Sequence, residues 1–135
     1  MALPNGAGGY QVGPGNRNET VMGAAAAPQT ATSTATLTAA QILGGMLVAN
    51  PSTSAATYTL PTASDVDAAL PNAVTGSTFD LNIVNVGTSS GAVTLSMGTG
   101  ITDGGNAAVA VAITSSAAFR FRKTGTAAWT AYKIA

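Results

Sequence analysis

Short runs in which apolar and polar residues alternate, separated by turn residues, recur through most of the chain. In the clearest run, Phe79, Leu81 and Ile83 alternate with polar residues. A second alternating run, residues 93–97, follows a Gly/Ser cluster at 87–91. A period of two residues is typical of a β-strand with one buried face. Two such runs joined by a short loop predict an antiparallel hairpin at the centre of the chain.

Comparable runs follow one another at a spacing of about ten residues, with turn residues between them. This spacing favours an all-β fold, namely a β-sandwich or jelly-roll-like barrel of about 7–9 short antiparallel strands. A β-solenoid is the rival architecture, but it requires a fixed repeat, and no clear repeat is visible. Besides the central hairpin, the predicted elements are a helical turn capped by Thr38 and closed by Gly44–Gly45, and strands at 46–49, 57–60, 109–113, 117–123 and 128–134.

One short helix is predicted within this fold, over residues 62–70. Thr62 or Ser64 is a suitable N-cap, and Asp65 and Asp67 fall in the first turn, where the helix dipole favours carboxylates. The alternative is that the two aspartates form an acid pair or bind calcium. Residues two apart on a helix do not face each other, so the capping role is favoured.

The residue content argues against most catalytic chemistry. The chain has no cysteine and no histidine, which excludes disulfides, zinc sites of the usual kind, thiol nucleophiles and Ser-His pairs. Asp65, Asp80 and Asp103 would be the carboxylates of a glycan hydrolase, but no spacing brings two of them together. The Gly-rich stretch 98–106 lacks the spacing of a dinucleotide fingerprint, and within it Asp103–Asn106 predicts an ordinary turn, with a metal site as the less favoured alternative. We therefore expect no enzyme, no catalytic, cofactor or metal site, and no small-molecule substrate.

Charge and hydropathy limit the partners. Charged residues make up 7% of the chain, against roughly 25% in an ordinary soluble domain, and five basic residues balance five acidic ones. Nucleic acid is not an expected partner, because there is no basic surplus to displace counterions from phosphates. No window reaches 18 apolar residues, so no membrane span is predicted.

The first part of the chain has a different composition from the rest. Residues 1–33 are rich in Gly and Pro and then in Ala, Thr and Ser, without a period of 2 or 3.6. We interpret them as an extended N-terminal arm preceding a domain at residues 34–135. The arm is either a disordered tail or a segment that orders against a neighbouring subunit or host surface. Its sizeable side chains are candidate partner contacts: Tyr10, Val12, Val21 and Met22.

The small number of large apolar residues favours self-association. Much of the 46% hydrophobic content is alanine, and aromatic residues make up only 5%. A fold with so small a core gains by burying more surface against another copy. We therefore expect a homo-oligomer in which Phe121, Trp129 and Tyr132 are candidate anchors.

A small positive strip near the C terminus is a further candidate contact. Arg120, Arg122 and Lys123 lie on one predicted strand, and Lys133 lies on its partner. The strip is either a solvated sheet face with edge protection or a docking face. As a docking face it would meet an acidic partner or form intersubunit pairs with Asp80 or Asp103.

Several stretches in this order resemble small virion proteins of tailed bacteriophages, the head decoration (cement) proteins and the small β-domains of tail fibres and spikes. The resemblance covers about residues 34–135, and the stretches that carry it are TATLTAAQILGG, TYTLPTASDVDAALPN, GSTFDLNIVNVG, AVTLSMGTGIT and FRFRKTGTAAWTAYKI. It implies trimers of β-rich domains on the outer surface of the capsid, across junctions between coat subunits.

The sequence is compatible with three alternative functions. The favoured one is a capsid decoration protein that binds the major capsid protein and other copies of itself, most simply as a homotrimer. The alternative is a tail-fibre or tail-spike domain that binds a host receptor or glycan, for which exposed aromatic side chains would be expected. An enzyme is the least favoured, for the reasons above.

Overall fold

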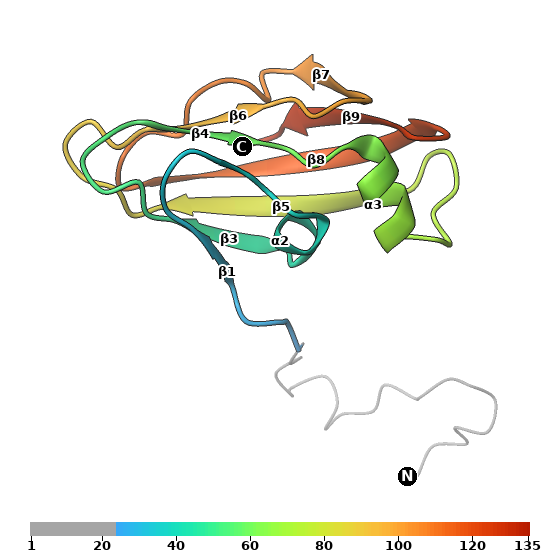
Figure 1. Ribbon diagram of the computed structural model, residues 1–135, viewed down its shortest axis with the longest axis horizontal. Helices are drawn as coiled ribbons and strands as arrows, with labels where there is room; N and C mark the ends of the chain where they lie inside the picture. The colour runs from blue at the N-terminus through green and yellow to red at the C-terminus, as the bar shows by residue number, and fades with distance from the viewer. Residues whose placement is uncertain (1–23) are drawn as a thin grey trace, which may run out of the picture.

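The structure is a computed structural model that describes residues 24–135 (Figure 1). Within that range the chain forms nine strands and two short helices. In chain order these are β1 (Gln29–Ala31), β2 (Ala35–Thr36), α2 (Ala39–Leu43), β3 (Met46–Ala49), β4 (Ala56–Thr59), α3 (Ala63–Ala69), β5 (Thr78–Asn85), β6 (Val93–Ser96), β7 (Ile101–Gly105), β8 (Ser115–Gly125) and β9 (Ala128–Lys133). The candidate arm contacts Tyr10, Val12, Val21 and Met22 lie outside the described residues.

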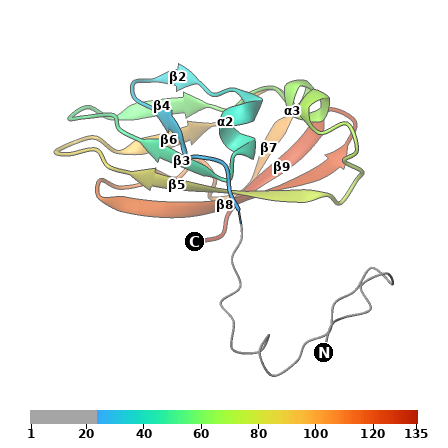
Figure 2. The same cartoon turned by 90° about the horizontal axis from the view of Figure 1, so that it is seen from below.

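The strands form two sheets that face each other across the core. One has six strands in the order β1-β3-β5-β8-β9-β7, and the other has three in the order β2-β4-β6, counted over residues 24–135. Figure 2 shows them as two layers, with the three-stranded sheet above and the six-stranded sheet below. Each helix follows a strand of the three-stranded sheet, α2 after β2 and α3 after β4.

The N-terminal two thirds of the described chain winds in three coils. The chain passes from the six-stranded to the three-stranded sheet three times, as β1 to β2, β3 to β4 and β5 to β6. Corresponding strands therefore stack in parallel: Thr30 pairs with Val48, and Val48 with Val84. In the other sheet, Thr36 pairs with Thr59, and Thr59 with Ser96. This winding is that of a short parallel solenoid.

The prediction of an antiparallel β-sandwich or jelly-roll barrel is therefore wrong. The fold is mixed α/β, with a six-stranded mixed sheet, a three-stranded all-parallel sheet and, within residues 24–135, two short helices. The central hairpin is also wrong, because β5 and β6 lie in different sheets. An alternating run shows which side chains of a strand are buried, but it contains no information on which strand lies beside it.

The C-terminal part closes the six-stranded sheet. β8 pairs antiparallel with β5 over eight residue pairs, from Thr78↔Arg122 to Asn85↔Ser115. β8 and β9 form an antiparallel hairpin, as predicted, and β7 pairs with β9 in parallel. Two predictions in this part are wrong. The predicted turn at 103–106 overlaps the end of β7, and 109–113 forms no strand.

Residues 109–113 meet β6 beside a buried asparagine, Asn85. Val111 exchanges both backbone hydrogen bonds with Val93, at 2.7 and 3.0 Å, but this bridge is isolated. Asn85 donates from Nδ2 to the carbonyl oxygens of Val111 and Gly91, and accepts from the Gly87 N–H. The side chain of Asn85 thus joins the β5–β6 loop to the β7–β8 loop, and the 109–113 segment pairs with β6 at a single residue.

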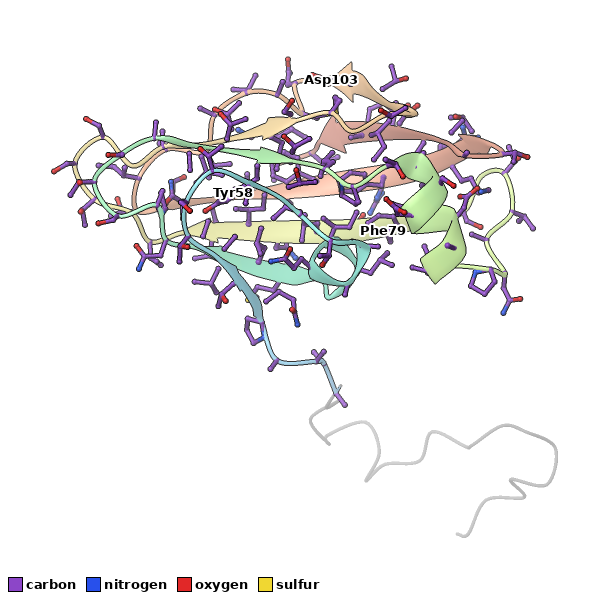
Figure 3. The ribbon with its side chains drawn as sticks, viewed as in Figure 1. Tyr58, Phe79 and Asp103 are labelled. Carbon is purple, nitrogen blue, oxygen red and sulfur yellow. The ribbon has the colours of Figure 1, made fainter. Side chains whose placement is uncertain are left out.

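The predicted inward faces are confirmed. Leu81 and Ile83 of β5 and Val93 and Leu95 of β6 are buried, although they line opposite walls of the core. Tyr58 is also fully buried, and its hydroxyl donates to the Thr32 carbonyl oxygen at 2.9 Å (Figure 3). The core therefore lies between the layers and contains residues of all three coils.

Both helices begin where the sequence predicts. Thr38 caps α2 in a capping box with Gln41, and Gly45 follows the helix at a φ of 84°. Thr62 caps α3 by accepting from the Asp65 N–H at 3.1 Å. Val66 on α3 is buried, so this short helix is held by a good cap and by packing on the core.

Candidate interaction surfaces

The Asp67 carboxylate fastens α3 to the β8–β9 hairpin. Its Oδ1 accepts hydrogen bonds from Lys123 Nζ and, at 2.8 Å, from Trp129 Nε1, while its Oδ2 accepts from the Ala127 N–H at 2.8 Å. The hydrogen bond from Lys123, followed by those from Ala127 and Trp129, lowers the pKa of the Asp67 carboxyl from 3.8 to about 2. Of the two predicted first-turn aspartates only Asp65 lies in the first turn of α3, so that prediction is wrong for Asp67, which is a structural tie.

The Asp67 tie removes part of the predicted positive strip from the surface. Lys123 is buried, and its ammonium group lies 5.4 Å from the centre of the Trp129 ring. Trp129 is also buried, as is Phe121, so neither ring is on the surface of this chain. In the sequence, Lys123 follows Phe119 and Phe121 at every second position. The inward orientation of the lysine could therefore have been predicted from this alternation.

The other basic residues of β8 remain exposed. Arg120 makes two parallel hydrogen bonds to Asp80, each 2.8 Å long, across the β5–β8 pair. The hydrogen bond from Arg120 lowers the pKa of the Asp80 carboxyl, and the same contact raises the pKa of Arg120. Arg122 is exposed farther along β8. Asp80 was predicted as a partner in an ion pair between subunits. In the structure it pairs with Arg120 of the same chain.

The half-buried Tyr132 covers the glycines of β7. A Cβ atom at Gly104 would lie only 2.5 Å from Cε1 of the Tyr132 ring. Asp103, beside it, accepts hydrogen bonds from the N–H groups of Gly105, Ala107 and Ala108 (Figure 3). These bonds, chiefly the one from Ala107, lower the pKa of the Asp103 carboxyl. The Gly-rich stretch is thus shaped by backbone contacts.

The outer face of the six-stranded sheet carries a group of apolar side chains. We name this group the apolar patch; its members are Met46, Val48, Val84, Val86, Ala118 and Ile134. The pairing makes them neighbours, since Val48 lies opposite Val84 and Asn82 lies between Met46 and Ala118. Met46, Val86 and Ile134 are 40%, 44% and 51% exposed.

The outer face of the three-stranded sheet is different. Its outward side chains are all hydroxyl-bearing, and we name them the hydroxyl face: Thr36, Thr57, Thr59, Thr94 and Ser96. They stack in register across the three coils, because Thr57 pairs with Thr94 and Thr59 with both Thr36 and Ser96. Hydroxyl groups at such positions hydrogen-bond to water without a protein partner.

Two hollows lie near α3. A groove of about 480 Å³ runs along the coil corner, with hydroxyl groups and the Asp65 carboxylate around an apolar floor that includes Leu37 and Leu60. A second, more apolar cup of about 390 Å³ lies beyond the end of α3, between Leu70 and Phe79. Phe79, one of the residues that line this cup and labelled in Figure 3, stacks on Phe121 with the ring centres 4.8 Å apart.

Comparison with protein-family models, with curated proteins and with solved structures finds no match to this chain. Among residues 24–135, no three acidic, histidine or cysteine side chains gather as a metal-binding group would require. No helix in the same range is long and apolar enough to cross a membrane.

Proposed function

We propose that the chain is a structural virion protein, a capsid decoration (cement) protein of a tailed bacteriophage. It binds the outer surface of the head, contacts the major capsid protein and other copies of itself, and stabilises the shell. The observation that carries this proposal is the apolar patch, a partly exposed apolar group on a rigid sheet, in a chain whose stretches resemble virion proteins. An exposed apolar group of this kind marks a protein–protein contact.

The carboxylates support a structural role. The four aspartates of residues 24–135 each hold part of the fold: Asp67 ties α3 to β9, Asp80 pairs with Arg120, Asp103 accepts from backbone N–H groups, and Asp65 accepts from the Thr62 hydroxyl. A hydrolase needs two carboxylates on either side of a substrate bond. These four are instead distributed over separate structural contacts.

The mechanism we infer is avidity. A decoration protein is present at many equivalent sites, and each copy contacts both the coat and its neighbours. Weak contacts at each site then add, because binding at one contact raises the effective concentration at the next. A small, nearly neutral domain suits this role, since no strong charge opposes close packing of copies.

Labelling of intact virions tests the location. Gold-conjugated antibody against this chain, applied to virions of the phage that encodes it, is expected to label the whole head surface. Heads prepared without the chain should bind it on addition and should then withstand heating better. Label confined to the tail tip, or heads that neither bind the chain nor gain stability, would contradict the proposal.

The coil-corner groove favours a second candidate, a tail-fibre or tail-spike domain that binds a glycan. The groove presents threonine hydroxyls and the Asp65 carboxylate, which are groups that hydrogen-bond to sugar hydroxyls. No aromatic side chain lines it, and an aromatic platform is the usual apolar contact of a sugar. Loss of host-glycan binding in an Asp65→Asn variant, with binding retained in Asp80→Asn, would support this candidate over the first.

A further inference from the structure

We infer that the apolar patch is where a second copy of this chain binds. The candidate anchors Phe121 and Trp129 are inside the fold, so self-association requires another surface. The apolar patch is the strongest candidate within residues 24–135, because its large side chains are partly exposed and lie on adjacent strands of a rigid sheet.

The pairing register places the members of the apolar patch in two neighbouring rows, the second of which contains one polar residue, Asn82. One row runs across the strands from Val48 to Val84, and the next runs from Met46 through Asn82 to Ala118. Ile134 extends the second row, because its N–H donates to the Ala118 carbonyl oxygen. The apolar side chains thus come from β3, β5, β8 and the end of β9, and they are held in place by backbone hydrogen bonds.

The face is large enough for a stable contact between two copies. The six strands of this sheet have 37 residues in all, which at a rise of about 3.3 Å per residue and a strand spacing of about 4.8 Å give a flat face of roughly 590 Å². Two copies that meet over this face would bury roughly 1,200 Å², which is the lower end of the roughly 1,200–2,000 Å² that standard interfaces bury in total. The three-stranded sheet, with half as many strands and shorter ones, falls well below that size.

Charge favours another copy of this chain as the occupant. The same face carries Asp80, Arg120 and Arg122, and the first two neutralise each other. A strongly acidic or basic partner would gain little from so weakly charged a surface. This chain, with five charges of each sign and 7% charged residues, is itself a weakly charged partner.

This inference deepens the proposed function, because self contacts are one half of that function, but it can fail independently. A chain that self-associates through the apolar patch yet does not bind heads would contradict the decoration function alone. A chain that binds heads as a monomer would contradict the inference alone.

Paired lysine variants test the surface. Sedimentation and light scattering of the full chain over a dilution series are expected to show an oligomer. Met46→Lys together with Val86→Lys should weaken association at least about tenfold, because ammonium groups of both copies then meet in the contact. The matched control, Thr36→Lys with Thr57→Lys on the hydroxyl face, should associate as the native chain does.

Cysteine cross-linking gives a second test that leaves the apolar side chains unchanged. The chain has no cysteine, so Asn82→Cys introduces one thiol at the centre of the apolar patch, and Thr57→Cys introduces one on the hydroxyl face. A short bis-maleimide linker should join two copies of Asn82→Cys and leave Thr57→Cys as a single chain. If the lysine variant of the apolar patch does not fold, cross-linking alone still tests whether two copies meet at this patch.

Three outcomes would overturn the inference. The first is that the native chain is a monomer at the highest concentration reached. The apolar patch would then be a contact for the coat protein or for the N-terminal segment. The second is that the two lysine variants weaken association equally. The third is that the thiol on the hydroxyl face cross-links as efficiently as the one on the apolar patch.

Discussion

The outer faces of the two sheets are built from similar strands but present different chemistry. On the three-stranded sheet every outward position holds a threonine or serine, and the face is half the width of its counterpart. On the six-stranded sheet the outward positions of β3 and β5 include Met46, Val48 and Val84. The inward positions of both sheets are mostly apolar, with Asn85 and Lys123 as the buried polar residues, so the main contrast between the sheets is on their outer faces.

This difference means that the two outer faces differ in how favourably water covers them. β-Branched threonine favours a strand as valine does, so the choice between them changes hydration and leaves the strand intact. Threonine stacked over three coils keeps one side in water, and valine and methionine on the other side gain by being covered.

The largest effect is expected inside the sheet that carries the apolar patch. Leu81→Asp removes a buried side chain worth roughly 1.5–3 kcal/mol and buries an unpaired carboxylate, which costs several kcal/mol more. The sum approaches the whole stability of a small domain, about 5–15 kcal/mol. We expect no folded protein by circular dichroism, whereas Asp80→Ala, on the outward side of the same strand, should fold. A folded Leu81→Asp variant would show that the faces of β5 are wrongly assigned.

The next largest effect is expected at the tie between α3 and the β8–β9 hairpin. Asp67→Asn leaves the buried Lys123 ammonium without its carboxylate and weakens the contacts to Trp129 and Ala127. It should lower the midpoint of thermal unfolding more than the same change at Asp65, which bonds only to the cap residue Thr62. Equal midpoints for the two variants would contradict a structural role for Asp67.

Acid should weaken the fold through the same group. The folded pKa of Asp67, about 2, lies below its unfolded value of 3.8, so the folded state holds this proton less tightly. The stability that Asp67 contributes is therefore present above about pH 4 and is lost as the pH falls toward about 2. Asp80 and Asp103 shift in the same direction. The midpoint of urea unfolding should fall as the pH is lowered through this window, and it should fall less in Asp67→Asn. The same dependence of the midpoint on pH in both proteins would contradict the role given to Asp67.

The smallest effect is expected on the hydroxyl face. Thr57→Val with Thr94→Val keeps the shape and strand preference of each side chain and removes two hydroxyl groups. The variant should fold as stably as the native chain but gain a second apolar surface. Light scattering should then show additional association at high concentration only. No change in mass would indicate that hydration of this face does not limit association.

Local patterns in the sequence predicted much of what lies within one element. The caps Thr38 and Thr62, the strand at 46–49 and the inward side chains of β5 all follow from residue type and period. These features depend on a few neighbouring residues. They therefore stay the same whichever strands lie on either side.

The pairing of strands could not be predicted in the same way. The three coils do repeat a pattern, with Thr-Ala-Thr at 34–36, Thr-Tyr-Thr at 57–59 and Thr-Leu-Ser at 94–96. The intervals between them differ, because the segment that contains α3 lengthens the second coil, and a search for a fixed period does not find them. The Asp67 tie was missed because its donors lie about sixty residues away, beyond any local pattern.

Cryo-electron microscopy of the virion is the most direct test of the central claim, that this chain holds surfaces together on the phage head. We expect copies on the outer surface of the capsid, with the apolar patch of each copy covered by a neighbouring copy and the hydroxyl face in solvent. Density for the chain only in the tail, or copies on the head with the apolar patch in solvent and the hydroxyl face covered, would contradict this account.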